Sequence, residues 1–238
     1  MRYALRAEWT KACTSPGLPA LLVTMVVSMV ALSAAVAAAT DPLPGTDLPK
    51  LGLTGVLLGQ AVVAVFGVLV MGDEYATGLV TVTLTAVPRR SCVLAAKAVV
   101  VAGVLAATAT IAVAGCVLAA RLALPADAVA VRPAVGSVLY LVLIGLLSLG
   151  IVTCVRSSAA GVGSVLALLY VLPIVTAAVA DPAWQRHLRQ IGPASAGLAV
   201  QATGGDLEIG PWTGLGVLAL WATGALLAGA ALLERRDA

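Results

Sequence analysis

Residues 134–155 read AVGSVLYLVLIGLLSLGIVTCV, and after Arg156-Ser157-Ser158 residues 159–180 read AAGVGSVLALLYVLPIVTAAVA. Neither run contains Asp, Glu, Lys or Arg. A helix needs about 20 mostly apolar residues to cross the hydrocarbon core of a bilayer, and both runs are long enough. This stretch therefore predicts two transmembrane helices joined by a short polar turn.

Four more segments outside this pair meet the same criterion and are also free of charged residues. Together the six predicted spans cover residues 17–40, 51–71, 98–120, 134–155, 159–180 and 213–233. Pro and Gly residues mark the gaps between them, and no gap is long enough to hold a soluble domain. We therefore expect an all-α integral membrane protein, with residues 1–238 forming one transmembrane domain.

The overall composition excludes the main soluble classes. Hydrophobic residues make up 61% of the chain and charged residues only 11%, against about 25% charged in an average soluble domain. The net charge is +3 and the basic residues are scattered, so no nucleic-acid partner is expected. The four cysteines form no C-x-x-C pair, and no metal site is expected.

The basic residues predict the orientation, because cytoplasmic loops collect Lys and Arg. With the N-terminus inside, nine Lys and Arg residues lie on the cytoplasmic side and five on the outer side. Both termini would then be cytoplasmic. A cleaved signal peptide is the alternative for the first span, but its 24 apolar residues exceed the usual apolar core of 7–15 residues.

Sequence motifs for catalysis and nucleotide binding are missing. The chain has no G-x-x-x-x-G-K-[ST], H-E-x-x-H or G-x-S-x-G motif, and His187 is its only histidine. We expect no enzyme activity and no cofactor bound by this chain. The uncharged spans also disfavour an ion-coupled carrier, which usually needs ionisable groups at membrane depth. Energy supplied by a partner fits better.

The segment after the second span carries charge at both ends. It begins with Asp73, Glu74 and Tyr75, passes Gly78, and ends with Pro88, Arg89 and Arg90. Apolar residues recur at helical spacing from Tyr75 onward, which predicts a short amphipathic helix starting near Asp73. Residues 80–85 also alternate as in a strand, and a solvated loop is a further alternative.

Three parts of the sequence resemble actinobacterial permease subunits of ATP-binding-cassette (ABC) exporters of the type-2 family. These are LRAEWTK at residues 5–11, the GDEY…G…PRR…AK pattern at residues 72–97, and ERRD at residues 234–237. The resemblance implies six spans, an N-terminal interfacial helix, a cytoplasmic coupling helix between spans 2 and 3, and short outer re-entrant helices between spans 5 and 6. It also implies a second permease copy or paralogue, and a separate cytoplasmic ATPase subunit that holds ATP and Mg.

The resemblance also suggests two groups of site residues. Coupling to the ATPase would involve Asp73, Glu74, Tyr75, Gly78, Pro88, Arg89 and Arg90. Spans 2 and 5 would line the substrate path, with Gln60, Phe66, Tyr170 and Pro173 as candidates, although for each of the four ordinary helix packing is the favoured interpretation. The G-x-x-x-G at residues 55–59 likewise suits packing within the chain or a dimer interface.

The segment between spans 5 and 6 predicts two short helices. Asp181 followed by Pro182 is a typical helix start, Trp184, Leu188 and Ile191 share one face, and Gly192-Pro193 ends the helix. A second short helix is expected within residues 194–203.

The leading hypothesis is an exporter permease in the bacterial cytoplasmic membrane that moves a hydrophobic or amphipathic substrate. The alternative is a non-transporting assembly or sensor protein of the membrane.

Overall fold

A computed structural model describes residues 2–14, 17–40, 46–79, 90–124, 130–204 and 209–235. Every regular element in these ranges is helical, and six helical runs are long and apolar enough to cross a membrane. They are α2 (Gly17–Ala39), α4 (Val56–Thr77), α6 (Arg90–Ala123), α7 (Val131–Val155), the run α8 (Ser158–Leu166), η2 (Ala167–Val171) and α9 (Leu172–Ala177), and α12 (Pro211–Arg235). The prediction of an all-α, multi-pass membrane protein is confirmed.

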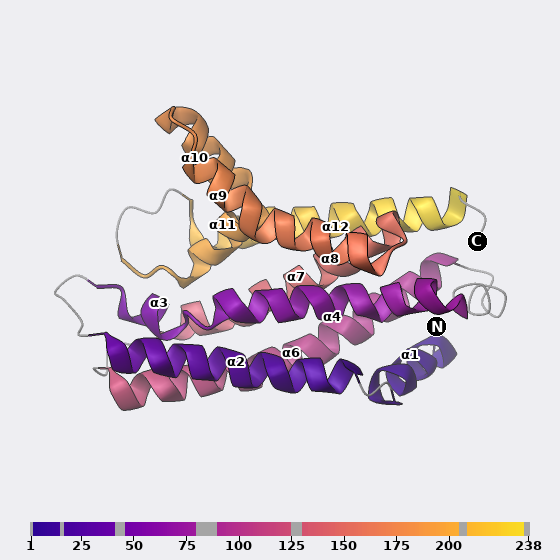
Figure 1. The fold of residues 1–238 in the computed structure, drawn as a ribbon, viewed down its shortest axis with the longest axis horizontal. Coiled ribbons are helices and arrows are strands. Elements are labelled where there is room, and N and C mark those ends of the chain that lie inside the picture. The colour runs from indigo at the N-terminus through magenta and orange to yellow at the C-terminus, as the bar shows by residue number, and fades with distance from the viewer. Residues whose placement is uncertain are drawn as a thin grey trace.

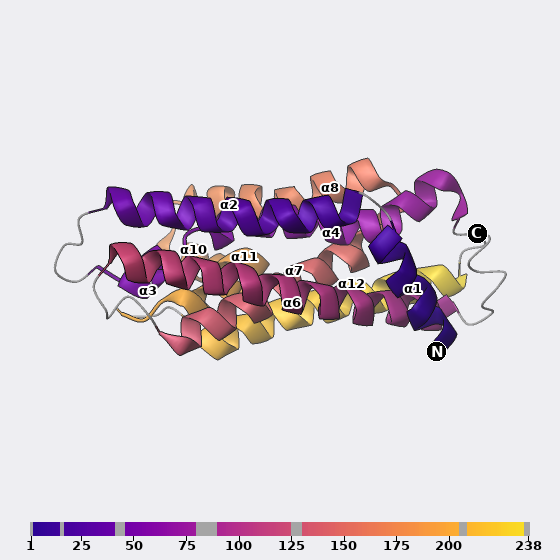
Figure 2. The same ribbon diagram turned by 90° about the horizontal axis from the view of Figure 1, so that it is seen from below.

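The six runs form an elongated bundle with both chain termini at one end (Figure 1). We call this the terminal end, and the other the opposite end. Helix α7 lies at the centre and packs against α4, α6 and α12. Its inward side chains, among them Tyr140, Ile144 and Leu147, are fully buried. Helix α2 lies beside α6, and α1 (Arg2–Thr14) packs against α6 at the terminal end (Figure 2).

Two helices run beyond the uncharged segments that predicted them. Helix α4 continues from the apolar residue Met71 to Thr77, and α6 begins at residue 90 rather than 98. Hydropathy identifies only the part of a helix that lies in the hydrocarbon core of the bilayer. The helical backbone hydrogen bonds continue beyond that part wherever the polar side chains there have partners. As a result Glu74 and Lys97, which flank the predicted spans, lie inside helices.

The fifth span is irregular at its middle. Residues Ala167–Val171 form a π-helical turn, in which the N–H of Leu172 donates to the carbonyl of Ala167. Pro173 follows directly and lacks an N–H of its own, which interrupts the regular α-helical pattern. Such π turns are rare in helices and frequent at functional sites.

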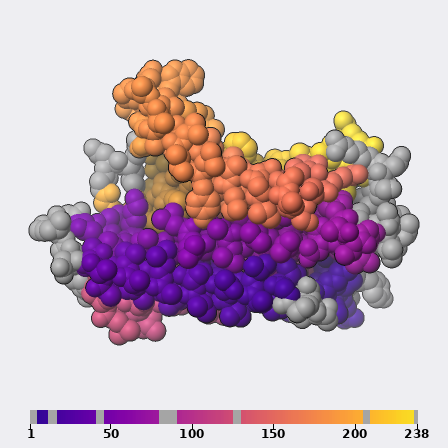
Figure 3. All heavy atoms as spheres, in the orientation of Figure 1, coloured from indigo at the N-terminus to yellow at the C-terminus, as the bar shows by residue number. Residues whose placement is uncertain are grey.

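Short helices cap the opposite end. Helix α3 (Leu48–Gly52) precedes α4, and α10 (Pro182–Ile191), α11 (Pro193–Leu198) and the 3₁₀ turn η3 (Ala199–Gln201) lie between spans 5 and 6. Asp181 caps α10 by accepting a 2.8 Å hydrogen bond from the N–H of Ala183, as the sequence predicts. Helix α10 has no buried residue and projects from the bundle (Figure 3).

The G-x-x-x-G of the second span serves packing within the chain. A Cβ atom on Gly55 would collide with the backbone carbonyl oxygen of Met29 on α2, and one on Gly59 would collide with the Met29 side chain. Only glycine lets α2 and α4 approach this closely. The described residues thus account for the motif without a dimer.

Candidate functional site

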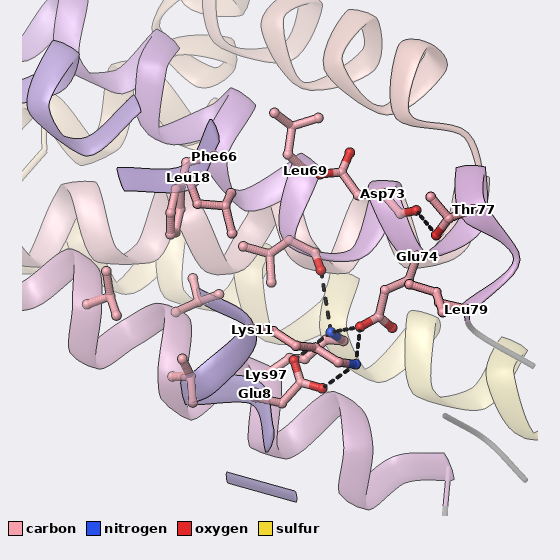
Figure 4. A pocket seen from close by; sticks show the side chains of 14 residues that line it. Glu8, Lys11, Leu18, Phe66, Leu69, Asp73, Glu74, Thr77, Leu79 and Lys97 are labelled. Atoms are coloured by element: carbon pink, nitrogen blue, oxygen red, sulfur yellow. Dashed lines mark hydrogen bonds and ion pairs between the residues drawn. The ribbon is translucent and has the colours of Figure 1, made fainter. Parts of the chain in front are cut away.

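Four charged side chains from three helices meet at the terminal end (Figure 4). The Lys97 Nζ atom on α6 lies 2.6 Å from Oε2 of Glu8 on α1 and 2.7 Å from Oε1 of Glu74 on α4. The Lys11 Nζ atom on α1 lies 2.8 Å from Oε1 of Glu74 and 3.5 Å from Oε1 of Glu8. We call Glu8, Lys11, Glu74 and Lys97 the charge cluster.

The charge cluster is largely buried and electrically balanced. The side chain of Lys97 is 1% exposed, those of Glu8 and Glu74 are 6% and 8% exposed, and that of Lys11 is 45% exposed. Burying a charge is costly unless it is paired and hydrogen-bonded. Two carboxylates and two ammonium groups satisfy this condition together, and the carbonyl of Val70 adds a 3.4 Å acceptor for Lys97. Removing one member would leave a buried charge without its partner.

Local helix geometry explains how each side chain reaches the charge cluster. Glu8 and Lys11 are three residues apart and therefore share one face of α1. Lys97 lies near the start of α6, and helical side chains lean toward the N-terminus of their helix. Its long aliphatic stem therefore extends along apolar surface while the ammonium group is carried toward the terminal end.

The setting of Lys11 keeps it charged. Partial burial lowers its pKa, but the hydrogen bond and charge of Glu74, with the charge of Glu8, outweigh that effect and raise the pKa above its ordinary 10.5. Lys11 therefore stays protonated across the physiological range and completes the neutrality of the charge cluster.

A cavity of about 290 Å³ lies next to the charge cluster, between α2, α4 and α6. We call it the terminal cavity. Its walls are apolar and are formed by Leu18, Phe66, Leu69, Val100, Val101 and Val104. Val70 and Leu79 also line it, and the charged or polar part of the described lining consists of the charge cluster with Asp73 and Thr77. Figure 4 shows how these side chains surround it.

The predicted coupling residues are only partly described. Asp73, Glu74 and Tyr75 lie in the last turns of α4, and Gly78 ends that helix with a φ of 71°. The expectation that the two acids begin a separate helix is therefore wrong, because α4 continues through them. Pro88 and Arg89 lie outside the described residues, and Arg90 is the first residue of α6.

The four candidate path residues do not surround one described cavity. Phe66 is 2% exposed and lines the terminal cavity. Gln60 is buried on α4, where its Oε1 accepts a hydrogen bond from the hydroxyl of Tyr140. The hydroxyl of Tyr170 donates a 2.5 Å bond to the carbonyl of Leu57 and so ties η2 to α4. Pro173 is half-buried beyond the π turn.

Sequence reasoning missed the roles of Glu8, Lys97 and Tyr140. The signals were weak: Glu8 stands three residues before Lys11, and Lys97 directly precedes an apolar run. Neither feature indicates that the two side chains meet. Tyr140 was the only tyrosine in its span, and its partner Gln60 is 80 positions away.

A second polar junction lies at the opposite end. One Asp47 carboxylate oxygen accepts a 2.6 Å bond from the Thr203 hydroxyl, and the other accepts bonds from the N–H groups of Thr203 at 2.6 Å and Gly204 at 3.3 Å. We call Asp47, Thr203 and Gly204 the Asp47 junction. Partial burial raises the pKa of Asp47, but these hydrogen bonds outweigh it and hold the pKa below 3.8.

Two more bonds fix the chain next to the Asp47 junction. Arg132 Nη2 donates a 2.5 Å bond to the carbonyl of Ala202, and Gln201 Nε2 donates a 2.9 Å bond to the buried hydroxyl of Ser137. Both attach the segment after α11 to α7. The turn η3 and the residue that follows it are therefore anchored to α7.

No protein-family model matches the chain, and no curated protein matches it. Among the described residues no group of His, Cys, Asp and Glu is arranged to hold a metal ion.

Proposed function

We propose that the chain is the transmembrane permease subunit of an ABC exporter in a bacterial cytoplasmic membrane. It moves a hydrophobic or amphipathic substrate and is powered by a separate cytoplasmic ATPase subunit that binds ATP and Mg. A second copy or a paralogue completes the pair of permeases. The terminal end is cytoplasmic, in line with the excess of basic residues there, and the short helices α10 and α11 dip into the outer leaflet.

The observation that carries the proposal is the charge cluster. It joins α1, α4 and α6 at the end of the bundle where α4 ends and α6 begins. A displacement of the chain between spans 2 and 3 by the ATPase reaches Glu74 first, because Glu74 lies in the last turn of α4. Lys11 then transmits the displacement to α1 and Lys97 transmits it to α6, so that the three helices move together.

The rest of the bundle supports an external source of energy. The uncharged central parts of the six spans offer no ionisable group with which a coupling ion could be bound or released. ATP hydrolysis by a partner supplies the driving force instead.

The test is to purify the tagged chain from its native membrane and measure ATPase activity in the complex. The wild type should retain an ATPase whose turnover rises with added substrate. Glu74→Gln keeps the size of the side chain but removes its charge, and should leave membrane insertion intact while lowering the stimulated ATPase activity. Glu234→Gln removes an exposed carboxylate near the end of α12 and serves as the matched control.

Two results would contradict the proposal. One is a well-folded chain that retains no ATPase, which would favour the non-transporting assembly or sensor protein. The other is a Glu74→Gln complex that responds to substrate as the wild type does.

A further inference from the structure

The terminal cavity combines apolar walls with an unbalanced charge. Among the residues that the structure describes, five ionisable side chains line it: Glu8, Asp73 and Glu74 are acidic, and Lys11 and Lys97 are basic. These five side chains together carry a net charge of −1. The four members of the charge cluster neutralise one another, so the excess negative charge belongs to Asp73.

The Asp73 carboxylate is available to a ligand. It makes no hydrogen bond or ion pair with another described residue, and the Thr77 hydroxyl donates its 2.7 Å bond to the backbone carbonyl of Asp73 instead. Figure 4 shows the side chain of Asp73 beside that of Leu69, turned away from the two lysines. A cation placed there meets the Asp73 carboxylate beside the apolar side chain of Leu69, which also lines the cavity.

We propose that the terminal cavity binds hydrophobic monocations, that is, small molecules with one ammonium group and an apolar body. The ammonium group pairs with Asp73, and the body lies against Phe66, Leu18 and Val101. One positive charge balances these five described side chains, whereas an anion of the same shape doubles their imbalance. The proposal deepens the proposed function and rests on it for the role of the ligand as substrate.

The size of the cavity limits the ligand. Its volume of about 290 Å³ lies just below the range for small-molecule sites, about 300–1,000 Å³. A single aromatic ring with a short alkyl chain is therefore a suitable probe. The ring can pack against Phe66, which is the only phenylalanine of the chain.

The experiment uses three probes that differ only in the head group: 4-phenylbutylammonium, 4-phenylbutan-1-ol and 5-phenylpentanoate. Equilibrium dialysis against the purified full chain in phosphatidylcholine nanodiscs, corrected with empty nanodiscs, gives each Kd. The ammonium probe should bind saturably and at least tenfold more tightly than the alcohol, and the carboxylate probe should bind most weakly.

Two pairs of variants locate the site. Asp73→Asn should weaken binding of the ammonium probe at least tenfold and leave the alcohol unchanged, and Glu234→Gln on α12 is its control. Val100→Phe fills the cavity and should abolish binding of both probes. Val99→Phe adds the same bulk at the neighbouring position, which is 55% exposed and does not line the cavity, and should leave both unchanged.

Three outcomes would overturn the proposal: equal binding of all three probes, tighter binding of the carboxylate probe, or no effect of Asp73→Asn. Probe binding is measured on the chain without an ATPase. The probes can therefore fail to bind although the ATPase of the complex still responds to substrate, and they can bind to a chain that recruits no ATPase. The two proposals are therefore tested separately.

Discussion

The two ends of the bundle attach their short helices in different ways. At the terminal end, four long charged side chains join α1 to α4 and α6. At the opposite end, the short side chain of Asp47 accepts bonds mainly from backbone N–H groups. Glycine contacts hold the backbones of α2 and α4 together beside it.

The difference lies in how much movement each attachment tolerates. Lys and Glu side chains have several rotatable bonds, so an ion pair between them can persist while the helices shift. A hydrogen bond from a backbone N–H to a side chain with one methylene group cannot follow such a shift. The terminal end is therefore suited to moving as a linked unit, and the opposite end to keeping its geometry.

The largest expected effect is on the charge cluster. Lys97→Met leaves two buried carboxylates with one partly exposed lysine and should lower the free energy of unfolding by about 3–5 kcal/mol. Lys11→Met removes the same charge from a side chain that is 45% exposed and should cost less than about 1 kcal/mol. Titration with SDS in mixed micelles measures both. Adding Glu74→Gln to Lys97→Met should restore part of the loss, and equal effects of the two lysine variants would contradict the burial argument.

Next in size is the contact between α2 and α4. Gly55→Ala places a methyl group against the Met29 carbonyl and should cost about 1–3 kcal/mol, as overpacking does. Gly103→Ala on α6 has open space around it and should be neutral or slightly stabilising. The same SDS titration measures the free energy of unfolding of both variants. An unchanged free energy of unfolding for Gly55→Ala would show that α2 and α4 are free to separate.

A smaller effect is expected at the Asp47 junction. Asp47→Ala should cost about 1 kcal/mol and speed amide hydrogen exchange at Thr203 and Gly204. Asp181→Ala removes a comparable helix cap from α10 and should leave these two amides protected. Exchange at Thr203 that does not change in Asp47→Ala would mean that the junction does not hold this segment.

The smallest effect is the pH dependence of the two ends, because both groups are partly exposed. The pKa of Asp47 is lowered, so its contribution is present above pH 3.8 and is lost as the pH falls through the folded value. The pKa of Lys11 is raised, so its contribution is present below pH 10.5 and is lost as the pH rises through the folded value. Unfolding midpoints measured across pH should show a weak acid limb that Asp47→Asn removes and a weak alkaline limb that Lys11→Met removes.

The spans and the start of α10 could be predicted because each depends on neighbouring residues. A run such as residues 134–155 is apolar whatever it packs against, and Asp181 caps the N–H of a residue two positions away. The bilayer and the first turn of a helix both respond to such local features. The sequence by itself determined that the chain is helical and crosses a membrane several times.

The candidate site depended on the tertiary structure. Lys97 meets Glu8 across 89 positions and Glu74 across 23, and no local pattern records that α1, α4 and α6 converge. The predicted helix start at Asp73 was wrong for the same reason, because α4 continues to Thr77 with Glu74 buried beside two lysines of other helices. Hydropathy is a property of each segment alone, whereas the pairing of buried charges is decided only when the helices have packed.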